Sequence, residues 1–426
     1  MKRIPSFPLT VLLLTSSLTG ARAQPSVPPP LRGSLAYAAG NAFVVRDLEN
    51  GKVVEIPAKE IGETHDNTGG VQPLAYSPDG RRLAVRVWKG GNRIYVLEEN
   101  LREAHWVTRG LLTETNGGTT YYWDHLDVAW SPDGRSLAVS SARAGEARVS
   151  AWDGESLRTL HKSTPPEHAT DPYRMSWSAD GETLYVVPPR GPEPQELIAV
   201  PFSKGEAVLL HRGPEKNPFT ALAWDPARKT LAVAAGTSLV LSGETGSKET
   251  WKSPAHLRAV SWSPDGRRLA GIDWNGGIYV VGRDGGDAWA VTGAIDDKWF
   301  APNVAWIGPA RFAFVLVTRT GGAGLYLADA ATRNVTRLPV TDMVATDLAP
   351  VPGRPAFTFL RVSDRGEWKV EPKSEREFRT RSVHTALHVY DASNGSVVPV
   401  PAAAAIPGEE TEGDFAVYLY PLLHLR

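Results

Sequence analysis

After residue 32 the chain contains many short segments in which apolar and polar side chains alternate. In one of them Val128 and Trp130 alternate with Asp127 and Ala129, the period of two that a half-buried β-strand requires. The next four residues are Ser-Pro-Asp-Gly, a composition typical of a tight turn. The apolar segment Leu137–Val139 follows as a second strand, so this part of the sequence predicts a β-hairpin.

The same hairpin pattern recurs along the chain, five times clearly and twice in a weaker form. The copies begin at Pro73 (PLAYSPDGRRLAVRV), Asp127 (DVAWSPDGRSLAVSS), Arg174 (RMSWSADGETLYVVP), Ala221 (ALAWDPARKTLAVAA), Ala259 (AVSWSPDGRRLAGID), Asn303 (NVAWIGPARFAFVLV) and Asp347 (DLAPVPGRPAFTFLR). A third strand follows at Arg93–Leu97 and Gly277–Val281, and a fourth at Val335–Leu338 and Val397–Val400. Four short strands in a unit of about 45 residues are typical of a propeller blade.

The two ends of the repeat region complement each other. Residues 35–56 resemble a blade that lacks its first strand, and Asp414–Tyr420 forms a single strand that supplies it. We therefore predict an all-β, closed propeller of four-stranded antiparallel blades over residues 33–426, most simply with eight blades. Seven blades is the alternative, because the last copy is degraded and carries an insertion. Closure by the C-terminal strand removes the exposed sheet edges that promote aggregation.

The sequence W-S-P-D-G-x-x-L-A at Trp130–Ala138 and Trp262–Ala270 resembles the WD-like propeller repeat of the TolB family. The resemblance covers about residues 33–420 and omits the small α/β domain that precedes the propeller in that family. It implies a periplasmic, partner-binding protein. Similar repeats also form the non-catalytic propellers of prolyl oligopeptidase-type peptidases, whose α/β-hydrolase domain has no counterpart in the repeats.

The N-terminal residues have the composition of an export signal. Lys2 and Arg3 precede the apolar segment Leu9–Leu14, and residues 21–23 (Ala-Arg-Ala) fit a cleavage site, so we expect a signal peptide over 1–23 that is cut after Ala23. Residues 24–32 form a Pro-rich leader. The sequence therefore predicts a periplasmic or secreted protein.

Composition excludes several classes of function. Lys+Arg is 46 and Asp+Glu is 47, a formal net charge of -1, which argues against nucleic acid as a partner. The longest apolar run is shorter than the 18 residues that a membrane-spanning helix needs, so we expect no membrane span. The absence of cysteine excludes disulfides, thiolate metal sites and a cysteine nucleophile. We expect no cofactor, and a monomer.

The known catalytic motifs are missing from the sequence. There is no Gly-x-Ser-x-Gly elbow, and the Gly-rich residues 321–324 suit a hairpin turn better than a phosphate-binding loop. The helical His spacing of common metal sites is also missing. These observations predict a protein that is not an enzyme and has no metal site.

The loops that enter the innermost strands of a propeller surround one mouth of its central channel. In this sequence these loops carry His, Asp, Asn and aromatic residues that could together bind a ligand or the polar terminus of a partner. The candidate binding residues are His65, Asp66, Asp124, His125, Tyr173, Asn217, His256 and Trp299. The alternative is that these groups cap strand ends and hold water in the channel.

Two recurring residue types and one insertion complete the sequence picture. The Asp of each Ser-Pro-Asp-Gly turn serves its own turn, and the recurring Trp packs between blades, so both sets are predicted to be structural. Residues 363–382 mix five acidic with six basic side chains and are predicted to form a solvated loop, with docking of a partner as the alternative.

Together these features predict an exported, soluble propeller that is a protein-interaction scaffold or ligand-binding protein of the bacterial cell envelope. Its partner is an envelope protein or small ligand. The alternative is a propeller lyase or hydrolase that acts on a sugar or peptide at the channel mouth, with His65, His125 or His256 as general base. A purely structural envelope protein is the third interpretation.

Overall fold

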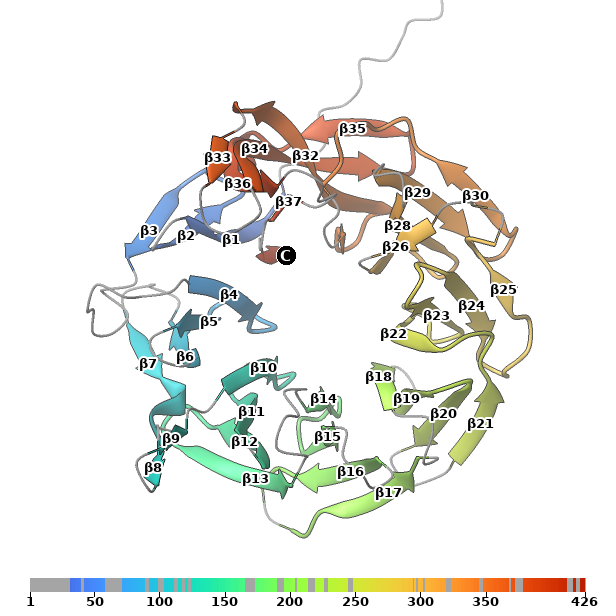
Figure 1. Cartoon of the computed structure of the whole chain (residues 1–426). Helices are drawn as coiled ribbons and strands as arrows, with labels where there is room; N and C mark the ends of the chain where they lie inside the picture. The colour runs from blue at the N-terminus through green and yellow to red at the C-terminus, as the bar shows by residue number, and fades with distance from the viewer. Residues whose placement is uncertain are drawn as a thin grey trace, which may run out of the picture. The chain divides into compact units, whose positions relative to one another are not determined.

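The computed structural model describes residues 31–425 with gaps. The longer gaps are residues 58–70, 165–172, 190–194, 214–218, 372–377 and 412–416, and the others span one to four residues each. Residues 1–30 lie outside the description, and with them the predicted signal peptide and most of the predicted leader. From Leu31 onward the chain forms eight antiparallel sheets arranged around a central axis (Figure 1), which confirms the eight-bladed propeller and makes the seven-bladed alternative wrong.

In the first four blades the strands run outward from the central axis in the following order. Blade 1 contains β38 (Leu422–Leu425), β1 (Gly33–Ala39), β2 (Ala42–Asp47) and β3 (Val53–Pro57). Blade 2 contains β4 (Val71–Tyr76), β5 (Leu83–Trp88), β6 (Asn92–Leu97) and β7 (Ala104–Trp106). Blade 3 contains β10 (Asp124–Trp130), β11 (Leu137–Arg143), β12 (Glu146–Trp152) and β13 (Leu157–Ser163). Blade 4 contains β14 (Arg174–Trp177), β15 (Thr183–Val187), β16 (Glu196–Pro201) and β17 (Val208–Arg212).

The other four blades follow the same order. Blade 5 contains β18 (Phe219–Asp225), β19 (Thr230–Ala235), β20 (Ser238–Gly243) and β21 (Lys248–Lys252). Blade 6 contains β22 (Leu257–Trp262), β23 (Arg268–Asp273), β24 (Ile278–Gly282) and β25 (Trp289–Ala290). Blade 7 has its innermost strand split into β26 (Lys298–Phe300) and β27 (Val304–Trp306), followed by β28 (Arg311–Thr318), β29 (Ala323–Asp329) and β30 (Asn334–Arg337). Blade 8 contains β31 (Ala349–Pro350), β32 (Ala356–Arg365), β34 (Phe378–Asp391) and β35 (Ser396–Pro399).

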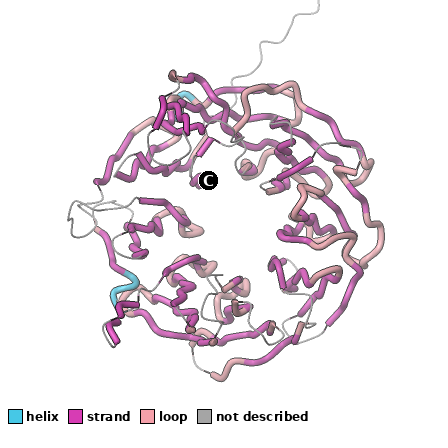
Figure 2. Tube along the Cα trace, in the orientation of Figure 1, coloured by secondary structure: helices cyan, strands magenta, loops and turns pink. Residues whose placement is uncertain are grey.

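Strands dominate the described part of the chain (Figure 2), which also contains two short 3₁₀ turns, Val107–Gly110 and Pro401–Ala403. A small hairpin of β8 (Glu114–Asn116) and β9 (Thr119–Tyr121) lies in the connection between blades 2 and 3. None of the described residues forms a helix that is long and apolar enough to cross a membrane.

The ring closes through the C-terminal strand, as predicted, but with a different segment. β38 pairs antiparallel with β1, from Gly33 opposite Leu425 to Ala36 opposite Leu422. The predicted segment Asp414–Tyr420 is not the closing strand, because its described residues form β37 (Val417–Tyr418), which pairs with β36 (Ile406–Thr411). The apolar residues at the very end of the chain therefore supply the closing strand.

Most of the described residues between 363 and 382 are strand, with Gly366 and Glu367 between two strands as the exceptions, so the predicted loop is wrong. β32 and β34 continue beyond the blade as a long hairpin, to which β33 (Lys369–Glu371) and β36 add. Long hydrogen-bonded strands hold the mixed charges of this segment on a sheet surface. The composition alone did not reveal this, because a mixed-charge segment suits an exposed strand as well as a loop.

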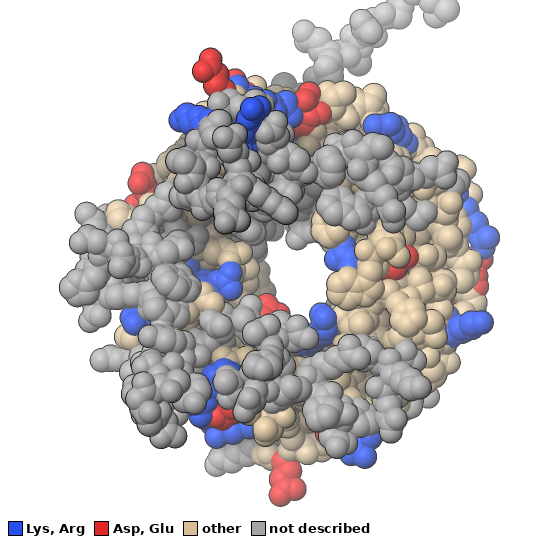
Figure 3. Space-filling view, viewed as in Figure 1, with Lys and Arg blue, Asp and Glu red and all other residues tan. Residues whose placement is uncertain are grey.

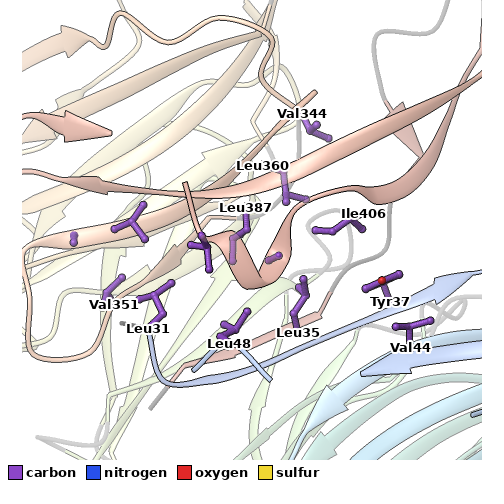
Figure 4. Close-up of a cluster of buried hydrophobic side chains, with 14 residues drawn as sticks. Leu31, Leu35, Tyr37, Val44, Leu48, Val344, Val351, Leu360, Leu387 and Ile406 are labelled. Carbon is purple, nitrogen blue, oxygen red and sulfur yellow. The ribbon is translucent and has the colours of Figure 1, made fainter. Parts of the chain in front are cut away.

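The hydrophobic core is divided among the interfaces between neighbouring blades. Each of eight clusters of buried side chains joins two adjacent blades. Figure 4 shows the cluster at the closure of the ring, where Leu35 and Tyr37 of blade 1 pack with Leu360, Leu387 and Ile406. Burial of apolar surface at every interface stabilises the ring without one large central core.

The recurring tryptophan links successive blades as well as filling the interfaces. The indole Nε1 of Trp130 donates to the carbonyl of Ala75 in the preceding blade at 3.1 Å, and Trp177 donates to Ala129 at 3.0 Å. Trp262 and Trp306 repeat this contact with Ala223 at 3.1 Å and Ser261 at 3.3 Å. The predicted structural role of these residues is confirmed.

The Asp residues of the turns also have the predicted structural role. In the turn of blade 3 the Ser131 hydroxyl donates to Asp133 at 2.6 Å, and the same carboxylate accepts the N–H of Arg135 at 3.0 Å. Equivalent serine–aspartate bonds are present at Asp79, Asp180 and Asp265. Each carboxylate is used within its own turn.

Candidate functional site

The candidate site is the mouth of the central opening, at the end where the innermost strands begin. The space-filling view in Figure 3 shows an opening through the ring, with both basic and acidic side chains at its border. The innermost strands β10, β14 and β22 bring Asp127, Arg174 and Arg258 to this region.

Asp127 and Arg174 place opposite charges on neighbouring blades. The Asp127 side chain is exposed, and its Oδ1 accepts the N–H of Val128 at 2.9 Å. Desolvation by the surrounding protein raises the pKa of Asp127, and this effect is opposed by the hydrogen bond from Val128 and by the positive charge of Arg174. The exposed carboxylate of Asp127 can accept a ligand's N–H group or ammonium.

Arg258 joins blades 6 and 7 at the mouth. Its Nε donates to the carbonyl of Asp273 at 3.2 Å, and its Nη2 donates to the carbonyl of Ala301. The guanidinium lies 4.8 Å from the centre of the Phe300 ring, a cation–π contact. Next to Asp273, the side chain of Trp274 is 63% exposed. This part of the mouth therefore combines a fixed positive charge with two aromatic rings.

Other polar groups at the mouth connect blades. The Thr220 hydroxyl of blade 5 donates to the carbonyl of Leu257 in blade 6. The amide of Asn303 in blade 7 donates to the carbonyl of Leu348 at 3.0 Å and accepts the Leu348 N–H at 3.0 Å. Such groups satisfy backbone atoms at strand ends, the structural role that was left open as the alternative to binding.

Tyr173 does not reach the mouth, so its prediction as a ligand-binding residue is wrong. It is fully buried, with its N–H bonded to Ser140 Oγ at 2.8 Å. Its hydroxyl donates to Ser163 Oγ at 2.7 Å and lies 3.2 Å from Nδ1 of His161. Burial raises the pKa of Tyr173 and lowers that of His161, so both groups are neutral members of an inter-blade network.

The other predicted residues have different positions in the fold. His256 is exposed and lies immediately before β22, on the mouth side of blade 6. Asp124 and His125 lie in β10 and Trp299 lies in β26, at the mouth ends of blades 3 and 7, and their side chains are outside the description. His65, Asp66 and Asn217 lie outside the described residues. Over the described ranges, no three His, Asp or Glu side chains meet in a group that would hold a metal ion.

Sequence reasoning missed Arg174, Arg258 and Trp274. The two arginines lie in strands whose alternation of apolar and polar residues was attributed to packing in the core. This alternation does not show whether one face of a strand lines the channel or meets the neighbouring blade. Trp274 did leave a signal, because the Trp in the turn sequence Asp-Trp-Asn-Gly has no place in the repeat pattern.

The fold and the channel place the protein among the eight-bladed β-propellers. No known family model matches the chain. A stretch of 216 residues is 30% identical to the uncharacterized peptidase YuxL of Bacillus subtilis, covering 46% of this chain and 28% of that protein. The chain thus spans less than a third of the length of this curated relative.

Three solved structures are similar to this chain to different extents. A prolyl endopeptidase structure matches 83% of this chain and 55% of its own with a TM-score of 0.50 at 15% identity. TolB of Acinetobacter baumannii matches 59% of this chain and 62% of its own with a TM-score of 0.35 at 16% identity. The propeller domain of Cps50 (Swd1) from Myceliophteria thermophila matches 68% of this chain and 95% of its own, with a TM-score of 0.42 at 10% identity. The prolyl endopeptidase match concerns the fold alone, and membership of the TolB family stays a prediction.

The comparisons correct the expectation that the protein is not an enzyme. That expectation rested on the missing catalytic motifs, whereas the curated relative, 30% identical over 216 residues, is named a peptidase. Catalytic residues that meet only by tertiary proximity leave no local motif, so a motif search was too narrow to exclude an enzyme.

Proposed function

We propose that this protein acts in peptide hydrolysis and that the mouth of its channel binds the peptide. The observation that carries the proposal is the 30% identity to a peptidase over 216 residues. Because only about 30 residues of this chain precede the propeller, the shared stretch must include propeller repeats. The relative and this chain therefore have propeller sequence in common.

The mouth has the chemistry that peptide binding requires. Asp127 offers a carboxylate acceptor for backbone N–H groups or an N-terminal ammonium, and Arg174 of the next blade carries the complementary charge. The ring holds these two groups on the innermost strands of neighbouring blades. The protein therefore loses little conformational entropy when a peptide binds. The proposal therefore favours the hydrolase, which the sequence analysis gave as the alternative, over the protein-interaction scaffold.

The absence of cysteine limits how cleavage can proceed. The attacking group is a serine or threonine hydroxyl or an activated water, because a thiolate is excluded. A fluorophosphonate probe labels activated serines covalently. It therefore distinguishes a serine nucleophile from an activated water.

The test is to incubate the purified protein with a defined mixture of peptides and to follow new peptide termini by mass spectrometry. We expect cleavage, and a KM that rises in Asp127→Asn while kcat changes less. Glu155→Gln is the matched control, since Glu155 is exposed on the β12–β13 turn of the same blade. Absence of cleavage would contradict the proposed hydrolysis, and an equal KM in the two variants would exclude Asp127 from the site.

A further inference from the structure

Two aromatic side chains stand exposed at the mouth end of blades 6 and 7. Trp274 is 63% exposed and Phe300 is 39% exposed, and they are the aromatic members of the exposed large hydrophobic residues in the described part of the chain. Their place follows from the strand register, because Asp273 pairs with Leu257 at the start of β22 and Phe300 ends β26, the first part of the split inner strand of blade 7. Both rings therefore face solvent on the side where the channel opens.

The turn that carries Trp274 is held in one conformation. Oδ1 of Asp273 accepts the N–H of Asn275 at 2.8 Å and that of Gly277 at 2.7 Å. Its Oδ2 accepts the hydroxyl of Tyr279 at 3.1 Å. A large apolar ring on a rigid, solvated turn does not stabilise the fold by burial, so its presence points to a surface used for binding.

Arg258 links the two backbone segments that carry the aromatic residues. Its guanidinium bonds to the carbonyl of Asp273, which immediately precedes Trp274, and to that of Ala301, which immediately follows Phe300. It also lies 4.8 Å from the centre of the Phe300 ring. The positive charge of the guanidinium attracts a negatively charged group that approaches the rings. We call Trp274, Phe300 and Arg258 the aromatic platform.

The chemistry of the platform selects its ligand. Aromatic faces favour another ring in stacked or edge-on contact, and a nearby guanidinium favours a carboxylate. A peptide that ends in an aromatic residue presents both groups on one residue, whereas a neutral sugar presents ring faces without the charge. We propose that the aromatic platform binds the C-terminal aromatic residue of a peptide. The choice of a peptide rests on the proposed function above.

The test measures binding without cleavage. The probe is fluorescein-labelled Gly-Ala-Ser-Gly-Phe as the free acid, and its matched probes are the C-terminal amide and the peptide ending in Ala. By fluorescence anisotropy we expect the free acid to bind, with Kd about fivefold weaker for each matched probe. We expect Trp274→Ala to weaken binding about tenfold and Trp274→Phe to retain most of it.

Val208→Ala is the control variant, because Val208 is 55% exposed on β17 of blade 4. It should leave Kd unchanged, and the melting temperature of each variant verifies its folding. An equal Kd for Trp274→Ala and wild type, an equal Kd for acid and amide, or no binding of the free acid to wild type would overturn the platform. Binding of maltohexaose that depends on Trp274, without peptide binding, would overturn it too.

The two proposals fail separately. Peptide cleavage that is insensitive to Trp274→Ala would sustain the proposed function and overturn the platform. Trp274-dependent binding without cleavage of any peptide would sustain the platform and overturn the proposed hydrolysis.

Discussion

Asp225 of blade 5 and Arg283 of blade 6 form an ion pair, with Nη1 of the arginine 2.7 Å from Oδ2 of the aspartate. Asp225 occupies the position that serine holds in the Ser-Pro-Asp-Gly turns of the other repeats. It is 1% exposed, and Arg283 also donates to the Thr230 hydroxyl at 2.8 Å. The guanidinium lies 5.1 Å from the centre of the Trp262 ring. A charged inter-blade contact has thus replaced a local turn contact at this one repeat.

Replacing Arg283 should destabilise the protein strongly. Arg283→Met leaves the buried carboxylate of Asp225 without its guanidinium partner, and we expect the free energy of unfolding to fall by about 3 kcal/mol. The double variant Asp225→Ser/Arg283→Met restores the serine of the other repeats and should recover most of the loss. Denaturant unfolding measures both. A double variant that is no more stable than Arg283→Met would show that the cost does not come from the unpaired carboxylate.

The inter-blade tryptophan bond has a natural comparison within the chain. Trp177 donates to the carbonyl of Ala129 and packs edge-on against Phe202, whereas Trp224 stacks on Tyr185 and its buried Nε1 has no hydrogen-bond acceptor among the described residues. Both Trp→Phe changes remove similar volume, but only Trp177→Phe breaks a hydrogen bond. We expect Trp177→Phe to cost about 1 kcal/mol more in chemical denaturation. Equal losses would argue against an energetic role for the indole bond.

Acid should weaken the protein partly through the turn aspartates. Hydrogen bonds from Ser131 and Ser178 hold the pKa of Asp133 and of Asp180 below the ordinary value for aspartate. Since the folded pKa is the lower one, the stabilisation is complete above about pH 4 and is lost as the pH falls through the folded pKa.

The double variant Asp133→Asn/Asp180→Asn tests this pH dependence. The side chains are close to solvent, so each should contribute only a few tenths of a kcal/mol. The melting temperature of the variant should fall less steeply than that of the wild type between pH 5 and about pH 3. A double variant that keeps the wild-type slope would show that these two carboxylates do not contribute.

Removal of the closing strand should open the ring. A chain that ends at Tyr420 lacks β38 and exposes the edge of β1, from Gly33 to Ala36. We expect a melting temperature lower by about 5 °C or more, together with self-association through the exposed edge. Added Pro-Leu-Leu-His-Leu-Arg peptide should restore part of the loss. Unchanged melting and elution on size exclusion would mean that β38 is dispensable for closure.

The sequence by itself determined the blade and the repeat. Val128 and Trp130 show the period of two of a strand, and Ser131 and Asp133 show the turn. The strand and the turn both depend on residues that are close in the sequence. Because every blade repeats the same local pattern, the number of blades and the structural roles of the tryptophans and turn aspartates followed from counting and spacing.

Only the tertiary structure decided which residues face the mouth. Tyr173 precedes an innermost strand, as a mouth residue should, yet it turns into the interface and bonds to Ser140 and Ser163. Arg258 lies inside a strand, yet it reaches the carbonyls beside Trp274 and Phe300 from two different blades. Alternation along one strand gives the face of that strand, but whether this face meets the next blade or the open channel depends on the ring as a whole. The same reason explains why β38, and not the segment before it, closes the ring: pairing with β1 is a contact between the two ends of the chain.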